Sequence, residues 1–251
     1  MLTEREFLRY ARQIVLPGAG AEGQEKLKRT SVCVVGAGGL GAPCIAYLAG
    51  AGVGRLVIIE PGRLEPGNLH RQIIYRNEDS GFSKARSAAA FAARLNPEVK
   101  ADMRIEPLEE GNAEHIVSDC DIVADCTDNF AARALINRTC VRLRKPLVYA
   151  AIYRFEAQLA VFMPGRGCLA CQFPSVEEGT IRPDEGVAGP AAGAAGAMQA
   201  MEALKLAWGM EPDGHMLLMD LRNNEFAKAR LRRLPGCPVC GGGANGKISG
   251  T

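Results

Sequence analysis

The chain has 251 residues, of which 47% are hydrophobic, and a formal net charge of +2 at neutral pH. Such a chain can bury a sizeable core as one large domain or two small ones, which excludes disorder as its main state. Basic and acidic residues are interspersed, so we expect no nucleic-acid partner and no membrane surface. The N-terminal residues are charged and no run of about 18 apolar residues occurs. We therefore expect a cytoplasmic protein.

Residues 1–30 are predicted to form two N-terminal helices. Apolar residues recur at helical spacing over Thr3–Val15, and the dipeptide Pro17-Gly18 breaks this pattern. A second helical pattern covers Glu22–Arg29. The nucleotide-binding core is expected to begin after these helices.

From residue 31 to residue 153, short apolar runs alternate with helical patterns. Ser31–Val35 and Arg55–Glu60 are predicted strands on either side of a helix over Leu40–Ala51, which makes a compact βαβ unit. This alternation predicts an α/β fold with a Rossmann-like, doubly wound, mostly parallel sheet. The later helices are expected over Phe82–Leu95, Ala113–Val117 and Asn129–Leu143, and the later strands over Val99–Ile105, Asp121–Asp125 and Leu147–Ala151.

The pattern changes in the C-terminal part, residues 154–240. Antiparallel strands are predicted over Ala157–Met163, Met216–Leu221 and Glu225–Leu231. The polar segment Gln172–Glu185 is typical of a mobile crossover loop, and Val187–Trp208 of a tightly packed buried helix. The tail, residues 241–251, is expected to be flexible. No linker or repeat divides the chain, so we predict one domain over 1–251.

A glycine-rich turn follows the first predicted strand. In this Gly-x-Gly-Gly-x-Gly segment, Gly36 permits the tight strand-to-helix turn, Gly38 and Gly39 let backbone N–H groups approach a phosphate, and Gly41 lets the helix pack close to the sheet. Glu60 ends the next strand, where an acidic side chain accepts ribose hydroxyls, although such a residue can equally be a solvated strand-end carboxylate. The turn alone is a weak signal for a nucleotide site.

The segment after Glu60 carries the positive charge that a triphosphate losing pyrophosphate requires. It contains Asn68-Leu69-His70-Arg71-Gln72 and then Lys84 at the start of a predicted helix. Farther on, Asp125-Cys126-Thr127-Asp128-Asn129 ends one strand and begins a helix. Asp128 can cap that helix or hold Mg²⁺ against the phosphates, since ligands bind at strand carboxyl ends in such sheets.

Two Cys-x-x-Cys pairs, Cys168/Cys171 and Cys237/Cys240, predict a structural zinc site. Each pair puts two thiolates on one tight turn, and two turns supply the four soft ligands of a closed tetrahedral Zn²⁺ site. Two disulfides, or two unrelated reduced pairs, are the alternatives. The long gap between the pairs means that a piece of the fold lies between the two halves of the site.

These motifs, in this order, resemble the ThiF/MoeB/HesA family, bacterial relatives of ubiquitin-activating enzymes. The resemblance runs from Arg9-Tyr10-x-Arg12-Gln13 to Gly236-Cys237-Pro238-Val239-Cys240-Gly241 and includes Gln199-Ala200-Met201-Glu202-Ala203. The Leu48–Gly54 stretch and the length lean towards ThiF. The resemblance implies that the C-terminal Gly-Gly carboxylate of a ubiquitin-like sulfur-carrier protein attacks the α-phosphate of ATP, giving an acyl-adenylate and pyrophosphate, with the residues after 153 binding the carrier.

Family roles then fall on particular residues of this chain. The resemblance assigns Glu60 to the ribose, Asn68, Arg71 and Lys84 to the phosphates, and Asp128 to Mg²⁺. It implies a homodimer in which Arg12 reaches into the neighbouring subunit's site. ATP and Mg²⁺ are thus the expected substrate and ion, with Zn²⁺ as a structural metal.

Three positions depart from the family pattern. Glu60 stands where the family usually has Asp, and Gly62 where a second acid is expected. The segment Gln172–Glu185 has no cysteine, and the family's loop cysteine falls at about Arg182. The resemblance therefore suggests that the reaction stops at the acyl-adenylate, that sulfur comes from a separate persulfide donor, and that Arg182 steers an acidic carrier face.

Two other functions compete with adenylation. An NAD-dependent oxidoreductase shares the glycine turn but has no evident need of Arg71, Lys84 and Asp128. A non-catalytic, zinc-stabilised binding module would leave the same three residues without a role. Which carrier is activated, of the thiamine type, the molybdopterin type or another, does not follow from these residues.

Overall fold

The computed structural model describes residues 1–174 and 186–241. Within these residues the strands form one eight-stranded sheet in the order β3-β2-β1-β4-β5-β6-β7-β8. The first five strands in this order are parallel, and each later neighbour pairs antiparallel. The predicted α/β fold, with a parallel core and antiparallel C-terminal strands, is confirmed. The strands are β1 (Ser31–Val35), β2 (Arg55–Ile59), β3 (Lys100–Arg104), β4 (Ile122–Asp125), β5 (Leu147–Tyr153), β6 (Glu156–Phe162), β7 (His215–Asp220) and β8 (Glu225–Arg230).

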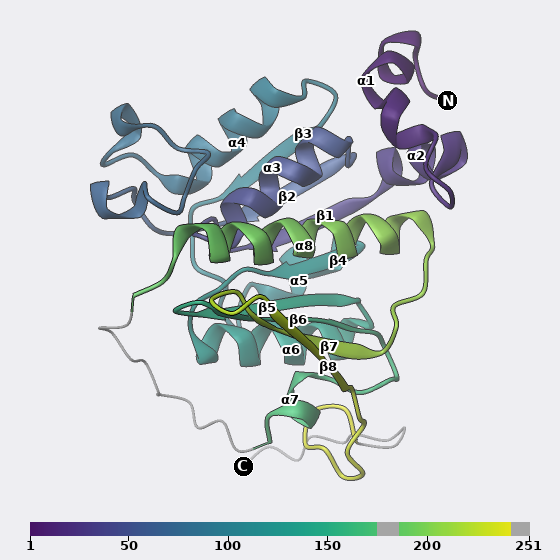
Figure 1. Cartoon of the computed structure of the whole chain (residues 1–251), viewed down its shortest axis with the longest axis vertical. Helices are drawn as coiled ribbons and strands as arrows, with labels where there is room; N and C mark the ends of the chain where they lie inside the picture. Colours follow the sequence, from purple (N-terminus) through teal and green to yellow (C-terminus); the bar gives the residue numbers. More distant parts are fainter. Residues whose placement is uncertain (175–185, 242–251) are drawn as a thin grey trace.

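Helices cover both faces of the sheet (Figure 1). In β1, Val32 and Val34 pack with α3, α4 and α8, whereas Cys33 and Val35 face α5 and α6. Buried apolar residues on both faces of a strand are typical of the parallel sheet in a doubly wound fold. The α-helices are α1 (Glu4–Ile14), α2 (Gly20–Arg29), α3 (Gly41–Ala51), α4 (Lys84–Leu95), α5 (Ala113–Ser118), α6 (Phe130–Leu143), α7 (Leu169–Gln172) and α8 (Gly189–Trp208), and two short 3₁₀ helices are η1 (Pro66–Asn68) and η2 (Asn77–Asp79).

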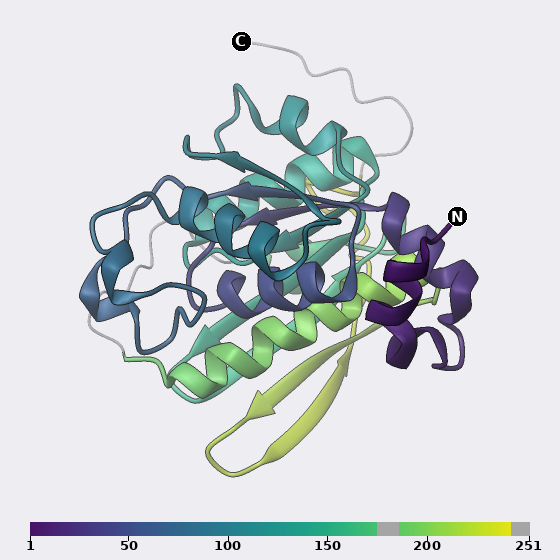
Figure 2. The ribbon, with the colours of Figure 1, turned by 90° about the horizontal axis from the view of Figure 1, so that it is seen from above.

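The N-terminal helices lie at the far end of α3 and α8 from the segment between β2 and α4 (Figures 1 and 2). Gln13 in α1 donates a hydrogen bond at 3.0 Å to the backbone carbonyl of Ala51, the last residue of α3. Tyr10 packs so closely on Gly52 that a Cβ there would lie 2.3 Å from the Tyr10 ring. Helix α1 is thereby attached to the C-terminal end of α3.

Several boundaries differ from the sequence prediction for local reasons. Helix α4 begins at Lys84 rather than Phe82, because Ser83 is its N-cap and accepts a hydrogen bond from the N–H of Arg86. The short helix α7 inside the first cysteine pair was not predicted, and Gln172 belongs to it rather than to a loop. Arg182 and the tail from residue 242 lie outside the described residues. No described helix is long and apolar enough to cross a membrane.

Candidate functional site

The glycine turn lies where β1 is flanked by β2 and β4, the point at which the strand order reverses. Gly36 has φ +95°, and a Cβ on it would lie 2.6 Å from the carbonyl oxygen of Cys126, which follows β4. A Cβ on Gly41 would lie 2.0 Å from the carbonyl oxygen of Gly36. Side chains are therefore excluded at both positions, and the carboxyl ends of β1 and β4 meet. Open doubly wound sheets bind their ligands at such a switch point.

Glu60 braces this turn. Its Oε2 accepts a hydrogen bond at 3.0 Å from the N–H of Ala37, and its Oε1 accepts one at 2.8 Å from the N–H of Gly62. A Cβ on Gly62 would approach Oε1 to 2.7 Å. The two positions that depart from the family pattern, residues 60 and 62, are therefore in direct contact, and a side chain at position 62 would crowd the Glu60 carboxylate.

Arg71 lies against the turn. A Cβ added to Gly39 would lie 3.4 Å from Cδ of Arg71, and one on Gly38 would lie 3.6 Å from Nε2 of Gln72. Arg71 is half-buried and its Nη1 donates to the carbonyl of Gly67 at 3.1 Å. The structure thus brings this predicted phosphate-binding residue to the glycine turn.

Lys84 and Asn68 reach the same region. Lys84 donates its N–H to the carbonyl of Gly62 at 3.0 Å, and its ammonium would lie 3.6 Å from a Cβ on Gly62, beside Glu60. Asn68 uses Oδ1 to accept from the N–H of Glu65 at 3.2 Å, and its Nδ2 has no hydrogen-bond partner in the described chain. A free donor of this kind suits an anionic ligand.

Tyr75 is a residue of the site that sequence reasoning missed. Its hydroxyl donates to the carbonyl of Ala37 at 2.7 Å, inside the glycine turn, and burial raises the pKa of the phenol. The turn is thus held from both sides, by Glu60 at the N–H of Ala37 and by Tyr75 at its carbonyl. The spacing of Tyr75 from the Asn-Leu-x-Arg-Gln motif was the available signal.

Asp128 is not the cap of α6. The N-cap is Asn129, whose Oδ1 accepts from the N–H of Ala132 at 2.9 Å. Asp128 is exposed, and within residues 1–174 and 186–241 its carboxylate has no hydrogen bond or ion pair. Of the two interpretations open in the sequence, the structural cap is wrong. Cys126 lies against the glycine turn, and Asp128 follows it by two residues. A free carboxylate at this place suits Mg²⁺, because that ion binds through one or two carboxylates plus substrate phosphates.

Arg12 is not brought to this site within one chain. It is exposed on α1, one residue before Gln13, which is attached to the C-terminal end of α3. The glycine turn is at the N-terminal end of the same helix, which has 11 residues. At 1.5 Å per residue the two ends are ~16 Å apart. A single chain therefore leaves Arg12 away from the other predicted site residues.

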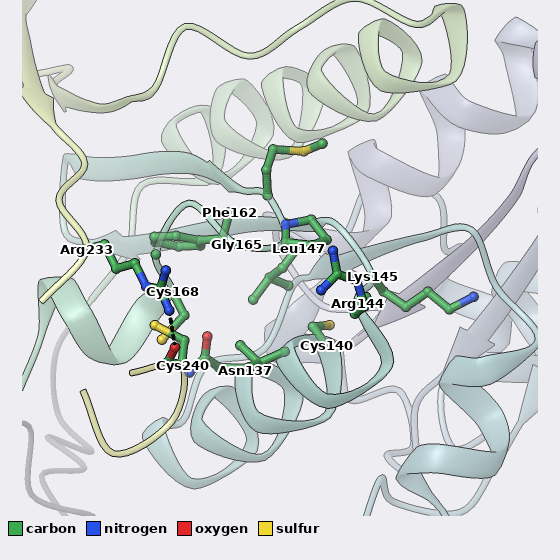
Figure 3. A pocket seen from close by; sticks show the side chains of 14 residues that line it. Asn137, Cys140, Arg144, Lys145, Leu147, Phe162, Gly165, Cys168, Arg233 and Cys240 are labelled. Carbon is green, nitrogen blue, oxygen red and sulfur yellow. Dashed lines mark hydrogen bonds between the residues drawn. The ribbon is translucent and has the colours of Figure 1, made fainter. Parts of the chain in front are cut away.

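The second candidate site is the cluster of four cysteines, two of which, Cys168 and Cys240, are drawn in Figure 3. Their Sγ atoms all lie within 4.8 Å of one another, with distances of 3.8 Å from Cys168 to Cys237 and 3.3 Å from Cys171 to Cys240. Tetrahedral zinc with Zn–S bonds of about 2.3 Å spaces its sulfur ligands by ~3.8 Å. The cluster fits Zn²⁺ with four thiolates and no open position. All four cysteines are free thiols in this structure, and the sulfurs of Cys168 and Cys171 lie 4.0 Å apart, about twice the length of a disulfide bond.

Two further residues support the cluster and were not predicted. Asn137 is buried, and its Oδ1 accepts from the N–H of Leu169 at 3.0 Å. Burial raises the pKa of Cys168, and a hydrogen bond from Asn137 opposes that rise. The Nη2 of Arg233 donates to the carbonyl of Cys240 at 2.9 Å (Figure 3). Such outer contacts orient metal ligands.

The remaining cysteines are packing residues, as predicted. All five are buried, and Cys126 is held by a hydrogen bond from its Sγ to Oε1 of Gln199 at 3.3 Å. Burial raises the pKa of Cys126 and Cys140, so their thiolates are disfavoured. The remaining three are Cys33, Cys44 and Cys120.

Known proteins resemble this chain over nearly its whole length. The chain is 44% identical to the sulfur carrier protein adenylyltransferase of Thermus thermophilus, over 95% of this chain and 92% of that protein. It is 39% identical to the sulfur carrier protein ThiS adenylyltransferase of Escherichia coli, over 96% of this chain and 98% of that one. A crystal structure of E. coli MccB with MccA-N7isoASN shares the fold, with a TM-score of 0.84 and 24% identity over 94% of this chain and 75% of that one.

The family model covers the glycine turn and three of the four clustered cysteines. It matches residues 10–239, from the first helix to the second cysteine pair. The chain belongs to the ThiF family.

Proposed function

We propose that this protein adenylates the C-terminal glycine of a ubiquitin-like sulfur-carrier protein, at the expense of ATP. The observation that carries the proposal is that Glu60 accepts a hydrogen bond from the glycine turn, with Arg71 beside Gly39 and Lys84 beside Gly62. The carrier's terminal carboxylate oxygen forms a bond to the α-phosphorus, and the bond from that phosphorus to the pyrophosphate oxygen breaks. The products are an acyl-adenylate and pyrophosphate, for sulfur transfer in thiamine or molybdopterin-type cofactor biosynthesis.

Each side chain has a distinct role in this reaction. Backbone N–H groups of Gly38 and Gly39 lie open to phosphate oxygens, and Glu60 keeps free lone pairs for ribose hydroxyls. Arg71 and Lys84 supply positive charge where negative charge accumulates on the leaving pyrophosphate. Mg²⁺, held by Asp128 and the phosphates, neutralises part of that charge when it is bound.

The active form is a homodimer in which each chain lends Arg12 to the other's site. The position of Arg12 at the far end of α3 supports this arrangement, because only a second chain can bring it to the phosphates. A groove of about 400 Å³ runs between α1, α3 and α8, with Tyr47 and Met201 exposed beside it. An exposed apolar groove beside α1 is suited to an isologous contact between two copies.

Residues 175–185 and 242–251 contain no cysteine. All nine cysteines lie in the described residues, and none of them provides an exposed thiol for a covalent enzyme–carrier intermediate. Four thiols are grouped for zinc and five are buried. The reaction therefore ends at the acyl-adenylate, and a separate persulfide donor supplies sulfur.

Intact-mass spectrometry tests both statements at once. The protein is incubated with ATP, Mg²⁺ and a carrier ending in Gly-Gly, without reductant. The proposal predicts a carrier species heavier by one adenylyl group and an enzyme of unchanged mass. A thiol-labile enzyme–carrier adduct would contradict the sulfur assignment, and failure of every Gly-Gly carrier to gain an adenylyl group would contradict the function.

A further inference from the structure

The residue before Asp128 is held at every polar atom. The N–H and the hydroxyl of Thr127 donate to Oδ1 of Asp125, at 3.0 and 2.6 Å. The carbonyl of Thr127 accepts from Nη2 of Arg133 at 2.8 Å. On the other side, Asn129 is the N-cap of α6. Asp128 thus lies between two anchored residues while its own carboxylate is free.

The two charged residues that hold Thr127 are buried. Asp125 has no exposed surface and Arg133 is 8% exposed. The Arg133 guanidinium carbon lies 5.5 Å from the ring centre of Tyr149 and 5.7 Å from that of Phe130, so aromatic rings fix its orientation. Burial raises the pKa of Asp125, and the Arg133 guanidinium on the other side of Thr127 opposes that rise.

This pair is poorly explained as a stabilising device. Two of its buried polar atoms, Oδ2 of Asp125 and Nε of Arg133, have no hydrogen-bond partner among the residues that the structure describes. Removing two charges from water generally costs more than their attraction returns unless every remaining lone pair and proton is satisfied. An apolar pair of the same size would serve packing better.

The backbone of Asp125 is anchored as well. Nε2 of Gln199, fully buried in α8, donates to the carbonyl of Asp125 at 2.7 Å. Two side chains therefore hold the connection between β4 and α6. Gln199 of α8 bonds the carbonyl of Asp125, and Arg133 of α6 bonds the carbonyl of Thr127. These contacts anchor the residues on either side of Asp128, whose own carboxylate makes no hydrogen bond or ion pair with a described residue.

We propose that Asp125 and Arg133 are positioning residues, which act through Thr127 to aim the carboxylate of Asp128 at the bound nucleotide and its Mg²⁺. This inference rests on the proposed function, because it presumes that Asp128 faces a magnesium–nucleotide complex. The two residues touch neither ligand. Replacing an outer residue that orients a metal ligand typically weakens metal binding 10- to 100-fold.

The test is calorimetry of ATP binding to the full chain at a series of Mg²⁺ concentrations, without carrier. For Arg133→Gln we expect the Mg²⁺ concentration that gives half-maximal enhancement of ATP binding to rise ~10-fold or more. Affinity for ATP without Mg²⁺ is expected to stay unchanged. Arg133→Lys keeps the charge but loses the planar guanidinium. Its half-maximal Mg²⁺ concentration should therefore fall between those of the wild type and Arg133→Gln.

A double variant shows whether Arg133 acts through Asp128. In the Asp128→Ala background, which itself weakens the Mg²⁺ effect, adding Arg133→Gln is expected to change ATP binding no further. An additional loss of the same size as in the wild-type background would overturn the inference. Unchanged Mg²⁺ dependence in folded Arg133→Gln would overturn it as well.

Ile136→Val is the matched control for lost stability. Ile136 is fully buried on α6, three residues after Arg133, and its apolar side chain makes none of the hydrogen bonds described above. It should lower the melting temperature and leave the Mg²⁺ dependence alone. If Arg133→Gln does not fold, Thr127→Val removes only the hydroxyl bond to Asp125, and a smaller shift in the same direction is expected. No shift in that variant would again contradict the inference.

The same titration separates this inference from the proposed function. Wild-type protein that binds no magnesium–ATP would overturn both. Wild-type protein that binds it in an Asp128-dependent way, with the Arg133 variants unchanged, would remove only the positioning role.

Discussion

Glu60 accepts a hydrogen bond at 3.0 Å from the backbone N–H of Ala37, so the end of β2 is tied directly to the glycine turn. The other carboxylate oxygen is bound by the N–H of Gly62 at 2.8 Å, and Gly62 in turn pairs with Lys84. One side chain thereby joins the glycine turn to the segment that leads to Lys84.

Gly62→Ala is expected to raise the KM for ATP severalfold, because its Cβ would approach Oε1 of Glu60 to 2.7 Å. Shortening the acid relieves the clash, so Glu60→Asp should reduce the effect of Gly62→Ala, with a coupling of ~0.5–3 kcal/mol. Pyrophosphate exchange at varied ATP measures all four forms. Gly67→Ala is the control, since nothing lies within 4 Å of its added Cβ. Strict additivity of the two substitutions would show that the residues are independent.

The fold and the site differ in how far the sequence predicts them. The alternation of apolar runs and helical patterns was enough to predict the parallel sheet. A strand buried on both faces must be hydrophobic along its length, as Ser31–Val35 is. Asp128 and Asn129 show the limit. Either can cap α6, and only the structure reveals that Asn129 does so and that Asp128 is free.

Contacts between distant segments were not predictable. Arg133 follows Asn129 by one helical turn, yet its contact with Tyr149 depends on how α6 packs against β5. Likewise, Asn137 looks like an ordinary helix residue until α7 is placed beside it. Such residues lack a local pattern because their role is tertiary.

The cysteine cluster predicts one zinc ion per chain. Cys237→Ser should lose the metal and lower the melting temperature by ~5–10 °C, since the ion pins the two cysteine turns together. Cys140→Ala is the matched control: Cys140 is buried but outside the cluster, so zinc content should stay at one. Elemental analysis with thermal unfolding provides the comparison. Wild-type protein without zinc, or a disulfide within either pair, would refute the assignment.

Glu6 predicts a pH-dependent attachment of α1. Burial pushes its pKa up, but hydrogen bonds from Lys28 and Thr3 outweigh that effect and hold the pKa below its usual value. A lowered folded pKa gives stability that is present above the unfolded pKa of ~4.3 and is lost as pH falls through the folded pKa. Glu6→Gln should therefore lower the free energy of unfolding by ~2 kcal/mol at pH 7.

Denaturant unfolding from pH 7 to pH 3 checks this expectation. The difference between wild type and Glu6→Gln should shrink towards zero at the acid end. Glu22→Gln removes an exposed pair with Lys26 on α2 and should have no measurable effect at any pH. A difference for Glu6→Gln that stays constant down to pH 3 would mean that the carboxylate charge is not its cause.

The place of Arg12 predicts complementation between subunits. Arg12→Ala and Asp128→Ala should each be inactive in adenylation while remaining folded. Mixing them should recover part of the activity, because a heterodimer contains one intact composite site. Subunit exchange is confirmed by differently tagged chains. Absence of recovery after proven exchange would place Arg12 outside the partner's site.

The central claim, adenylation of a carrier's C-terminal glycine, is tested most directly by carrier-dependent exchange of labelled pyrophosphate into ATP. Carriers of the thiamine type and the molybdopterin type are assayed separately, each with a variant lacking its terminal glycine, and NAD binding serves as the counter-test. The account predicts exchange with at least one intact carrier, none with its truncated form, and loss of exchange in Arg71→Ala and Asp128→Ala. Binding of NAD without exchange for any carrier, or full exchange in both variants, would contradict it.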